Sequence, residues 1–243
     1  MPINLGKGPN VVAASNVLFG SGTGGVDAQK VVFGTGTGIV TAWERKKKFS
    51  DNFEYGAEAV LPSPPWFVTG TPPYNLVSNG GNVRVYNDGS DGAYSSNARW
   101  LEKVATDAQF SKGKLVNIGS TSRGTWVAIN GNMVAGTFVG AQWTGNTIQM
   151  FNNLSTVTTA RSAAITRTQV AGDWFEIRSE IVSGKPFYSC LVNGTVVQTW
   201  NDSTNAAPWG DSYRSVGFGM QRNRSFFTTT HSTQFSDWEG GDF

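Results

Sequence analysis

A chain of 243 residues is long enough for one large β-sandwich and a small additional segment. Its 30 glycines and 9 prolines, with only 15% charged residues, indicate short strands joined by many turns and exclude a mainly helical protein. A formal net charge of +2 is too small to indicate binding to nucleic acid or to an anionic membrane.

The N-terminal segment, residues 1–46, contains an internal repeat, because residues 17–24 return in similar form as residues 31–38. Each copy is a short apolar strand followed by a glycine-rich turn. A hairpin of this size cannot bury its own apolar face, so we expect it to associate through its edges or apolar surface. A phosphate-binding loop at residues 20–25 is disfavoured, since no Lys-Ser or Lys-Thr follows it. The candidate assembly residues are Val17, Leu18, Phe19, Val31, Val32, Phe33 and Trp43.

The N-terminus shows neither a basic region leading into an apolar core nor a long apolar run, so it predicts no signal peptide and no membrane insertion. The charged run at residues 44–48 is interpreted as a solvated connector, with contact to an acidic neighbour as the alternative. A second domain is expected to cover residues 49–243.

The first third of this domain mixes turns with ambiguous stretches. Residues 61–73 hold five prolines and are expected to form a loop over the sandwich. The turn at residues 87–92 contains oxygen ligands, but a calcium loop would need other residues in place of Gly89 and Ala98, so a plain hairpin is favoured. Residues 97–110 fit either a helix or strands.

Short alternating strands follow at residues 125–130, 136–143 and 147–151. In the first, Val127 and Ile129 suit the core, which directs Trp126 outward. Trp209 lies in a predicted loop. Both are candidate glycan contacts, because exposed indoles stack on sugar rings; the alternative is that they cover the sandwich edge or meet a neighbouring subunit.

Residues 172–200 predict three consecutive antiparallel strands. Phe175, Ile177, Ser179 and Ile181 share one face of the first strand, so that face is expected to be buried. The dipeptide at residues 193–194, Asn-Gly, favours a type I′ turn before the last strand. The single cysteine lies within the second strand and is expected to be a buried thiol.

This pattern, with Gly-x-Trp at its start and Trp200 at its end, resembles the penultimate strands of concanavalin A-like jelly rolls of the laminin G type. Residues 215–220 resemble the next core strand and residues 235–238 the closing one. The resemblance implies an all-β jelly-roll sandwich preceded by a small β or extended assembly segment, and it implies strands rather than a helix at residues 97–110.

The paired repeat followed by a jelly roll also resembles the N-terminal attachment region of actinobacteriophage minor tail proteins. That resemblance implies a virion component, made in the host cytoplasm, that docks onto other phage tail proteins through its N-terminal segment. It implies a homo-oligomer whose jelly roll is displayed outward and contacts the host surface.

Signals for chemistry are few. Glu176, Arg178 and Glu180 have a spacing similar to glycosidase carboxylates, but the central arginine opposes the neutral acid that such catalysis needs. A single histidine, His231, excludes a multi-histidine metal site. We therefore expect no catalytic residues, no metal and no cofactor. The prediction is a non-enzymatic minor tail protein; the alternative is a lectin-like module that recognises cell-wall glycans.

Overall fold

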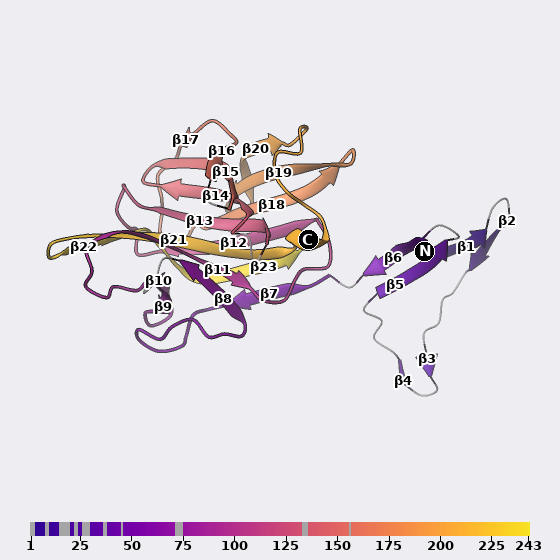
Figure 1. Cartoon of the computed structure of the whole chain (residues 1–243), viewed down its shortest axis with the longest axis horizontal. Helices are drawn as coiled ribbons and strands as arrows, with labels where there is room; N and C mark the ends of the chain where they lie inside the picture. Colours follow the sequence, from indigo (N-terminus) through magenta and orange to yellow (C-terminus); the bar gives the residue numbers. More distant parts are fainter. Residues whose placement is uncertain are drawn as a thin grey trace. The chain divides into compact units, whose positions relative to one another are not determined.

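The computed structural model divides the chain into two compact units, residues 1–45 and residues 46–243 (Figure 1). Residues 46–70, 75–132, 136–155 and 157–243 are described in full, whereas in the first unit only the backbone of the strands is described. Each unit is therefore treated by itself.

The N-terminal unit consists of antiparallel strand pairs. Its paired strands are β1 (Ile3–Lys7) with β2 (Asn10–Ala14), β3 (Gly20–Ser21) with β4 (Gly24–Gly25), and β5 (Lys30–Thr35) with β6 (Gly38–Glu44). Of the candidate assembly residues, Val31, Val32 and Phe33 lie on β5 and Trp43 lies opposite Val31 on β6. Residues 17–19 fall outside the described residues, so the assembly role stays a prediction.

The second unit is a sandwich of two antiparallel sheets, as predicted from the sequence. Sheet 1 has the strand order β20-β19-β18-β12-β23-β10-β9, with β7 also paired to β23. Sheet 2 has the order β16-β15-β14-β13-β21-β11-β8, with β17 and β22 attached. The two sheets lie face to face (Figure 1), and one apolar core draws on the inner faces of both.

The strands of sheet 1 are β7 (Lys48–Asp51), β9 (Leu76–Ser78), β10 (Val83–Val85), β12 (Gln109–Val116), β18 (Trp174–Val182), β19 (Lys185–Val192), β20 (Thr195–Asn201) and β23 (Gln234–Asp242). Those of sheet 2 are β8 (Trp66–Gly70), β11 (Gly92–Trp100), β13 (Gly124–Gly131), β14 (Phe138–Thr144), β15 (Thr147–Leu154), β16 (Val157–Ala160), β17 (Ile165–Thr166), β21 (Ser215–Ser225) and β22 (Thr228–His231). A short 3₁₀ helix, η1 (Asp211–Tyr213), is the one helical element found in the described ranges, which hold no helix that could cross a membrane.

Tryptophans dominate the core. Trp66, Trp143 and Trp238 are fully buried, and the rings of Trp66 and Trp238 meet at 4.8 Å in an edge-to-face arrangement. Aromatic pairs of this geometry stabilise a core beyond the area that they bury. Much of the high tryptophan content therefore serves packing between the two sheets.

The three strands predicted at residues 172–200 are confirmed as β18, β19 and β20. Phe175, Ile177 and Ser179 are fully buried, whereas Ile181 near the hairpin end is 40% exposed. Positive φ angles of 51° at Asn193 and 75° at Gly194 agree with the expected type I′ turn.

One stretch differs from the sequence-based expectation, and another decides between two alternatives that the sequence left open. Residues 66–70 form β8 at an edge of sheet 2, because three of the prolines precede the strand and none lies within it. Residues 97–110 belong to β11, a loop and β12, so the strand alternative holds and the helix does not form.

In the turn at residues 87–92, the buried guanidinium of Arg222 lies 2.7 Å from the carboxylate of Asp88. It also donates to the carbonyl of Ser90 at 3.1 Å and lies 4.4 Å from the ring of Tyr94. An arginine of the chain itself thus satisfies the carboxylate that a bound cation would otherwise use.

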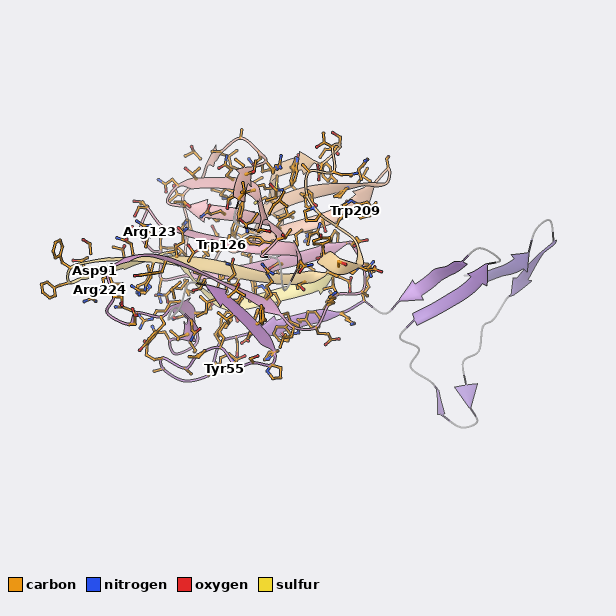
Figure 2. All side chains as sticks on the ribbon, viewed as in Figure 1. Tyr55, Asp91, Arg123, Trp126, Trp209 and Arg224 are labelled. Atoms are coloured by element: carbon orange, nitrogen blue, oxygen red, sulfur yellow. The ribbon has the colours of Figure 1, made fainter. Side chains whose placement is uncertain are left out.

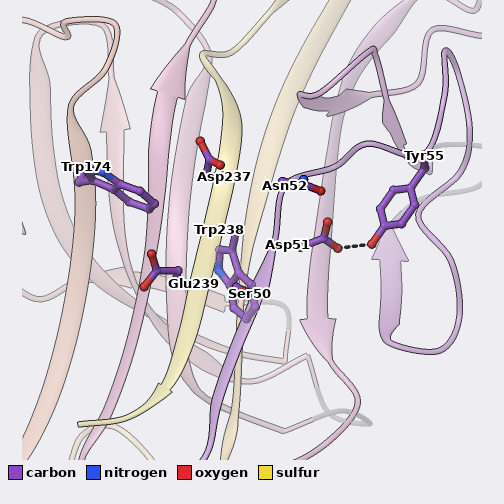
Figure 3. Close-up of a pocket in the computed structure, with 8 residues that line it drawn as sticks. All are labelled: Ser50, Asp51, Asn52, Tyr55, Trp174, Asp237, Trp238 and Glu239. Carbon is purple, nitrogen blue, oxygen red and sulfur yellow. Dashed lines mark hydrogen bonds between the residues drawn. The ribbon is translucent and has the colours of Figure 1, made fainter.

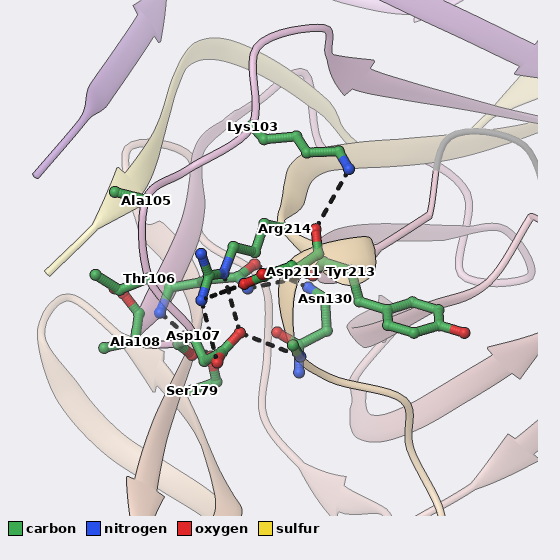
Figure 4. A network of polar contacts seen from close by, with 12 residues as sticks. Lys103, Ala105, Thr106, Asp107, Ala108, Asn130, Ser179, Asp211, Tyr213 and Arg214 are labelled. Atoms are coloured by element: carbon green, nitrogen blue, oxygen red, sulfur yellow. Dashed lines mark hydrogen bonds and ion pairs between the residues drawn. The ribbon is translucent and has the colours of Figure 1, made fainter. Parts of the chain in front are cut away.

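Two carboxylates, the partly buried Asp107 and the fully buried Asp242, fix the loops at one end of the sandwich. Asp107 accepts hydrogen bonds from the backbone of Gly210 at 3.1 Å and from Arg214 at 3.3 Å, which anchors the segment around η1 (Figure 4). Asp242 accepts from the backbone of Lys47 at 2.9 Å and of Thr106 at 2.7 Å. The start and the end of the sandwich are therefore joined at one edge.

Candidate functional site

A groove crosses the outer face of sheet 2, with a volume of about 240 Å³. We call it the amide groove. Its lining residues are Ser95, Asn97, Trp126, Phe138, Gln142, Phe151, Asn153, Thr158 and Gln221. They come from β11, β13, β14, β15, β16 and β21, so the groove runs across the middle of the sheet.

Glycines on the same sheet face let large side chains of the groove lie flat. A Cβ built on Gly219 would come within 2.2 Å of the indole of Trp126, and one on Gly140 within 2.7 Å of the ring of Phe151. Contacts this short do not occur between non-bonded carbon atoms. The rings of Trp126 and Phe151 therefore pack directly on the backbone of these glycines, and a side chain at either glycine would push the ring away from the sheet.

Several polar side chains of the groove, those of Asn97, Asn153 and Gln221, are held by hydrogen bonds. The indole nitrogen of Trp126 donates to Oδ1 of Asn97 at 3.0 Å. Oε1 of Gln221 accepts from the backbone of Gly124 at 2.9 Å, and Asn153 donates to the carbonyl of Gly136 at 2.6 Å. None of the lining residues is charged. The arrangement offers fixed amide donors and acceptors beside apolar rings.

A second and larger depression, of about 490 Å³, lies on the outer side of sheet 1 near β7 (Figure 3). We call it the edge groove. Its lining residues are Ser50, Asp51, Asn52, Tyr55, Trp174, Asp237, Trp238 and Glu239.

Asp51 organises the inner end of the edge groove. It accepts hydrogen bonds from the hydroxyl of Tyr55 and, at 2.5 Å, from the indole nitrogen of Trp66. Desolvation first, and then the hydrogen bond to Asp51, raises the pKa of Tyr55 well above its ordinary value. Tyr55 therefore stays a neutral hydrogen-bond donor to Asp51.

The two predicted glycan contacts lie in different places (Figure 2). Trp126 points to the outer face, as the alternation of its strand predicts, but it is only 5% exposed because neighbouring groove residues cover it. Trp209 lies half-buried in the loop before η1 and lines neither groove.

Sequence reasoning missed most of the groove residues. Asn97, Gln142 and Gln221 gave no signal, since isolated amides in strands have no distinctive spacing. The alternation that buries Phe175 directs the neighbouring Trp174 to the outward face, yet nothing in the sequence indicates that β23 and β7 complete a depression beside it.

Three other residues with titratable side chains, Cys190, His231 and Glu176, line neither groove. Burial raises the pKa of the Cys190 thiol well above its usual range. Burial, with Arg84 and Arg222 nearby, lowers the pKa of His231 to about 4. Glu176 is buried and forms an ion pair with Arg178 at 2.5 Å.

Comparison with known proteins identifies the fold of the chain but assigns it to no family. No protein-family model and no curated protein sequence matches the chain. Among solved structures it is similar to a prokaryotic β-1,3-1,4-glucanase (lichenase) derived from a mouse hindgut metagenome, with 11% identity over 80% of this chain and 98% of that one, and a TM-score of 0.54. An endo-1,3-β-glucanase from Streptomyces sioyaensis matches with 11% identity over 79% and 94% of the two chains, and a TM-score of 0.52.

A protein of unknown function from Shewanella oneidensis MR-1 also matches, with 11% identity over 81% and 86% of the chains and a TM-score of 0.53. The predicted concanavalin A-like jelly roll is thereby confirmed. The prediction of a non-enzymatic protein is contradicted, because the fold is one that glycoside hydrolases use, and that prediction is withdrawn. At 11% identity the likeness shows the fold, and any activity has to be argued from the residues of this chain.

Proposed function

We propose that the jelly roll binds a neutral glycan in the amide groove. The observation that carries this proposal is the lining itself, in which uncharged amides and hydroxyls surround aromatic rings. Sugars present hydroxyl groups that both donate and accept hydrogen bonds, together with apolar C–H faces that pack on aromatic rings.

The absence of charge in the lining supports the choice of a neutral ligand. A charged sugar would lose its hydration in the groove without meeting an opposite charge among the lining residues, which is costly. A neutral sugar exchanges hydrogen bonds to water for hydrogen bonds to amides such as those of Asn97 and Gln142. Because the indole of Trp126 donates a hydrogen bond to Asn97, the positions of this ring and this amide in the groove depend on each other.

The first experiment is calorimetric titration of the full chain with soluble β-1,3-glucan and β-1,3-1,4-glucan oligosaccharides. These probes are chosen because two proteins of the same fold are named for those linkages. Trp126→Ala and Gln142→Ala should each weaken binding at least about tenfold, equivalent to about 1.4 kcal/mol. Trp209→Ala is the matched tryptophan control and should leave binding unchanged.

The same samples test for catalysis, because release of reducing ends from either glucan would identify a hydrolase. Retaining and inverting glycosidases use a pair of carboxylates, and the lining of the amide groove contains none.

Equal binding by the wild-type chain and both groove variants would refute the proposal. Binding lost only in Trp209→Ala would move the site to the loop before η1.

We further propose that residues 1–45 attach the jelly roll to other chains, as the resemblance to minor tail proteins implies. The division of the chain after Arg45 supports this proposal. Light scattering of the full chain beside a variant lacking residues 1–46 tests it. An oligomer that becomes a monomer on truncation supports attachment through this segment, whereas identical masses count against homo-oligomerisation through it.

A further inference from the structure

The edge groove has a composition that the proposed function does not use. It shares no residue with the amide groove and lies on the outer side of the other sheet. Figure 3 shows Trp174 at one end and Tyr55 at the other, with Asp237 and Glu239 between them. Two exposed carboxylates thus stand between two aromatic rings.

Lysines of the neighbouring strand lie directly opposite these carboxylates. On β12, which pairs with β23, Lys112 lies 2.9 Å from Glu239 and Lys114 lies 3.7 Å from Asp237. All four side chains keep contact with solvent. The floor therefore presents donors and acceptors side by side, and the opposite charges of these two pairs cancel.

The aromatic residues of the edge groove are accessible. The ring of Trp174 is half-buried and carries the ammonium of Lys112 at 4.5 Å from its centroid. Tyr55 is 38% exposed, and its hydroxyl is bonded to Asp51, which holds the ring in place. Two fixed aromatic surfaces thus flank the charged floor.

This chemistry selects among ligand classes. A cationic ligand would be repelled by Lys112, whose ammonium contacts both the indole of Trp174 and the carboxylate of Glu239. An anionic ligand would approach Asp237, Glu239 and Asp51. A hydroxyl group can bond to both members of such an ion pair, because it donates to a free lone pair of the carboxylate and accepts from another N–H of the ammonium.

We propose that the edge groove is a second binding site for a neutral polyhydroxylated ligand, a glycan, held by Trp174, Asp237 and Glu239. The two sites face away from each other across the sandwich. One jelly roll then contacts two glycan chains, or binds a dense glycan surface with an avidity that exceeds either single affinity.

The test uses the full chain with neutral hexasaccharides of β-1,3-glucan, β-1,3-1,4-glucan, chitin and mannan, and follows the indole N–H signals of the tryptophans by NMR. The signal of Trp174 is assigned as the one missing in Trp174→Ala. We expect it to shift on titration with at least one probe, and native mass spectrometry of the wild-type chain with that probe to show two ligands bound.

Trp174→Ala should reduce the number of bound ligands from two to one, and Asp237→Asn with Glu239→Gln should weaken the second site at least about tenfold while preserving side-chain size. Phe227→Ala removes a 94% exposed ring at the β21–β22 turn and is the control that should change nothing. No shift of the Trp174 signal with any probe overturns the proposal.

The outcomes separate the two sites. If Trp126→Ala abolishes all binding and Trp174→Ala has no effect, the amide groove stands and the second site is refuted. If binding survives in Trp126→Ala and is lost in Trp174→Ala, the edge groove is the site and the proposal for the amide groove is wrong. An acidic hexasaccharide of galacturonic acid should bind the edge groove at least about tenfold more weakly, and equal binding would refute the assigned ligand class.

Discussion

Replacing Gly219 by alanine tests the floor of the amide groove directly. The added methyl carbon would lie 2.2 Å from Cε2 and 2.5 Å from Nε1 of Trp126. Because carbon atoms in contact lie about 3.5–4.0 Å apart, the indole has to move outward by more than about 1 Å. Its 3.0 Å hydrogen bond to Asn97 would then be lost.

The sign of the effect on stability is diagnostic. Alanine in place of a strand glycine ordinarily stabilises a protein by about 0.5–1 kcal/mol, because the unfolded chain loses conformational freedom. Overpacking costs about 1–3 kcal/mol and a lost hydrogen bond about 1 kcal/mol. We therefore expect Gly219→Ala to lower the free energy of unfolding by about 1–3 kcal/mol, or the melting temperature by roughly 3–10 °C.

A double-mutant cycle isolates the contact with Trp126. In a Trp126→Leu background the new methyl group meets no indole, so Gly219→Ala should be neutral or slightly stabilising. The coupling between the two positions should be about 2 kcal/mol by thermal or urea unfolding. If Gly219→Ala raises stability equally in both backgrounds, the indole does not rest on Gly219 and the geometry of the amide groove is wrong.

Three further predictions concern buried groups of the sandwich. Arg222→Met should lower the melting temperature by roughly 2–6 °C, because it removes the hydrogen bonds from the buried guanidinium to Asp88 and to the carbonyl of Ser90; an unchanged value by calorimetry would contradict the pairing. The pKa of His231 is about 4 in the folded chain and about 6.5 in the unfolded chain, so only the unfolded chain binds a proton there between these two values. The contribution of His231 to the free energy of unfolding is therefore constant above pH 6.5 and falls as the pH decreases from 6.5 to about 4. His231→Gln should remove part of that decline in unfolding curves measured across this window, and identical pH profiles would count against it. Cys190 should react with a thiol reagent only after denaturation, and rapid labelling of the native chain would show that it is accessible.

Much of the fold could be predicted because it follows local pattern. Alternation placed Phe175 and Ile177 inside, and the residue types at 193–194 predicted the turn that closes the hairpin. The same alternation directed Trp126 outward. These features depend on residues that are close together in the sequence, so the sequence alone is enough to predict them.

The grooves depend instead on residues brought together from distant strands. Gly219 supports Trp126 although 92 residues separate them along the chain, and no local pattern pairs them. The strand β8 was missed because prolines on either side of it obscured a short edge strand. Alternation also predicts that Glu176 lies on the solvated face of its strand, yet it is buried, because alternation assigns a face but not what covers that face.

The joining of the sandwich ends has a mechanical consequence. Lys48 of β7 lies opposite Gly241 of β23, and Lys47 is bonded to Asp242. A pulling force applied through these two positions would open the β7–β23 pair one hydrogen bond at a time, starting from the edge, which is the geometry of a zipper. A load applied through residue 47 and a ligand in the amide groove, which lies on the other sheet, would instead act across the packed core between the two sheets. The same domain would therefore yield easily in one direction and resist in another.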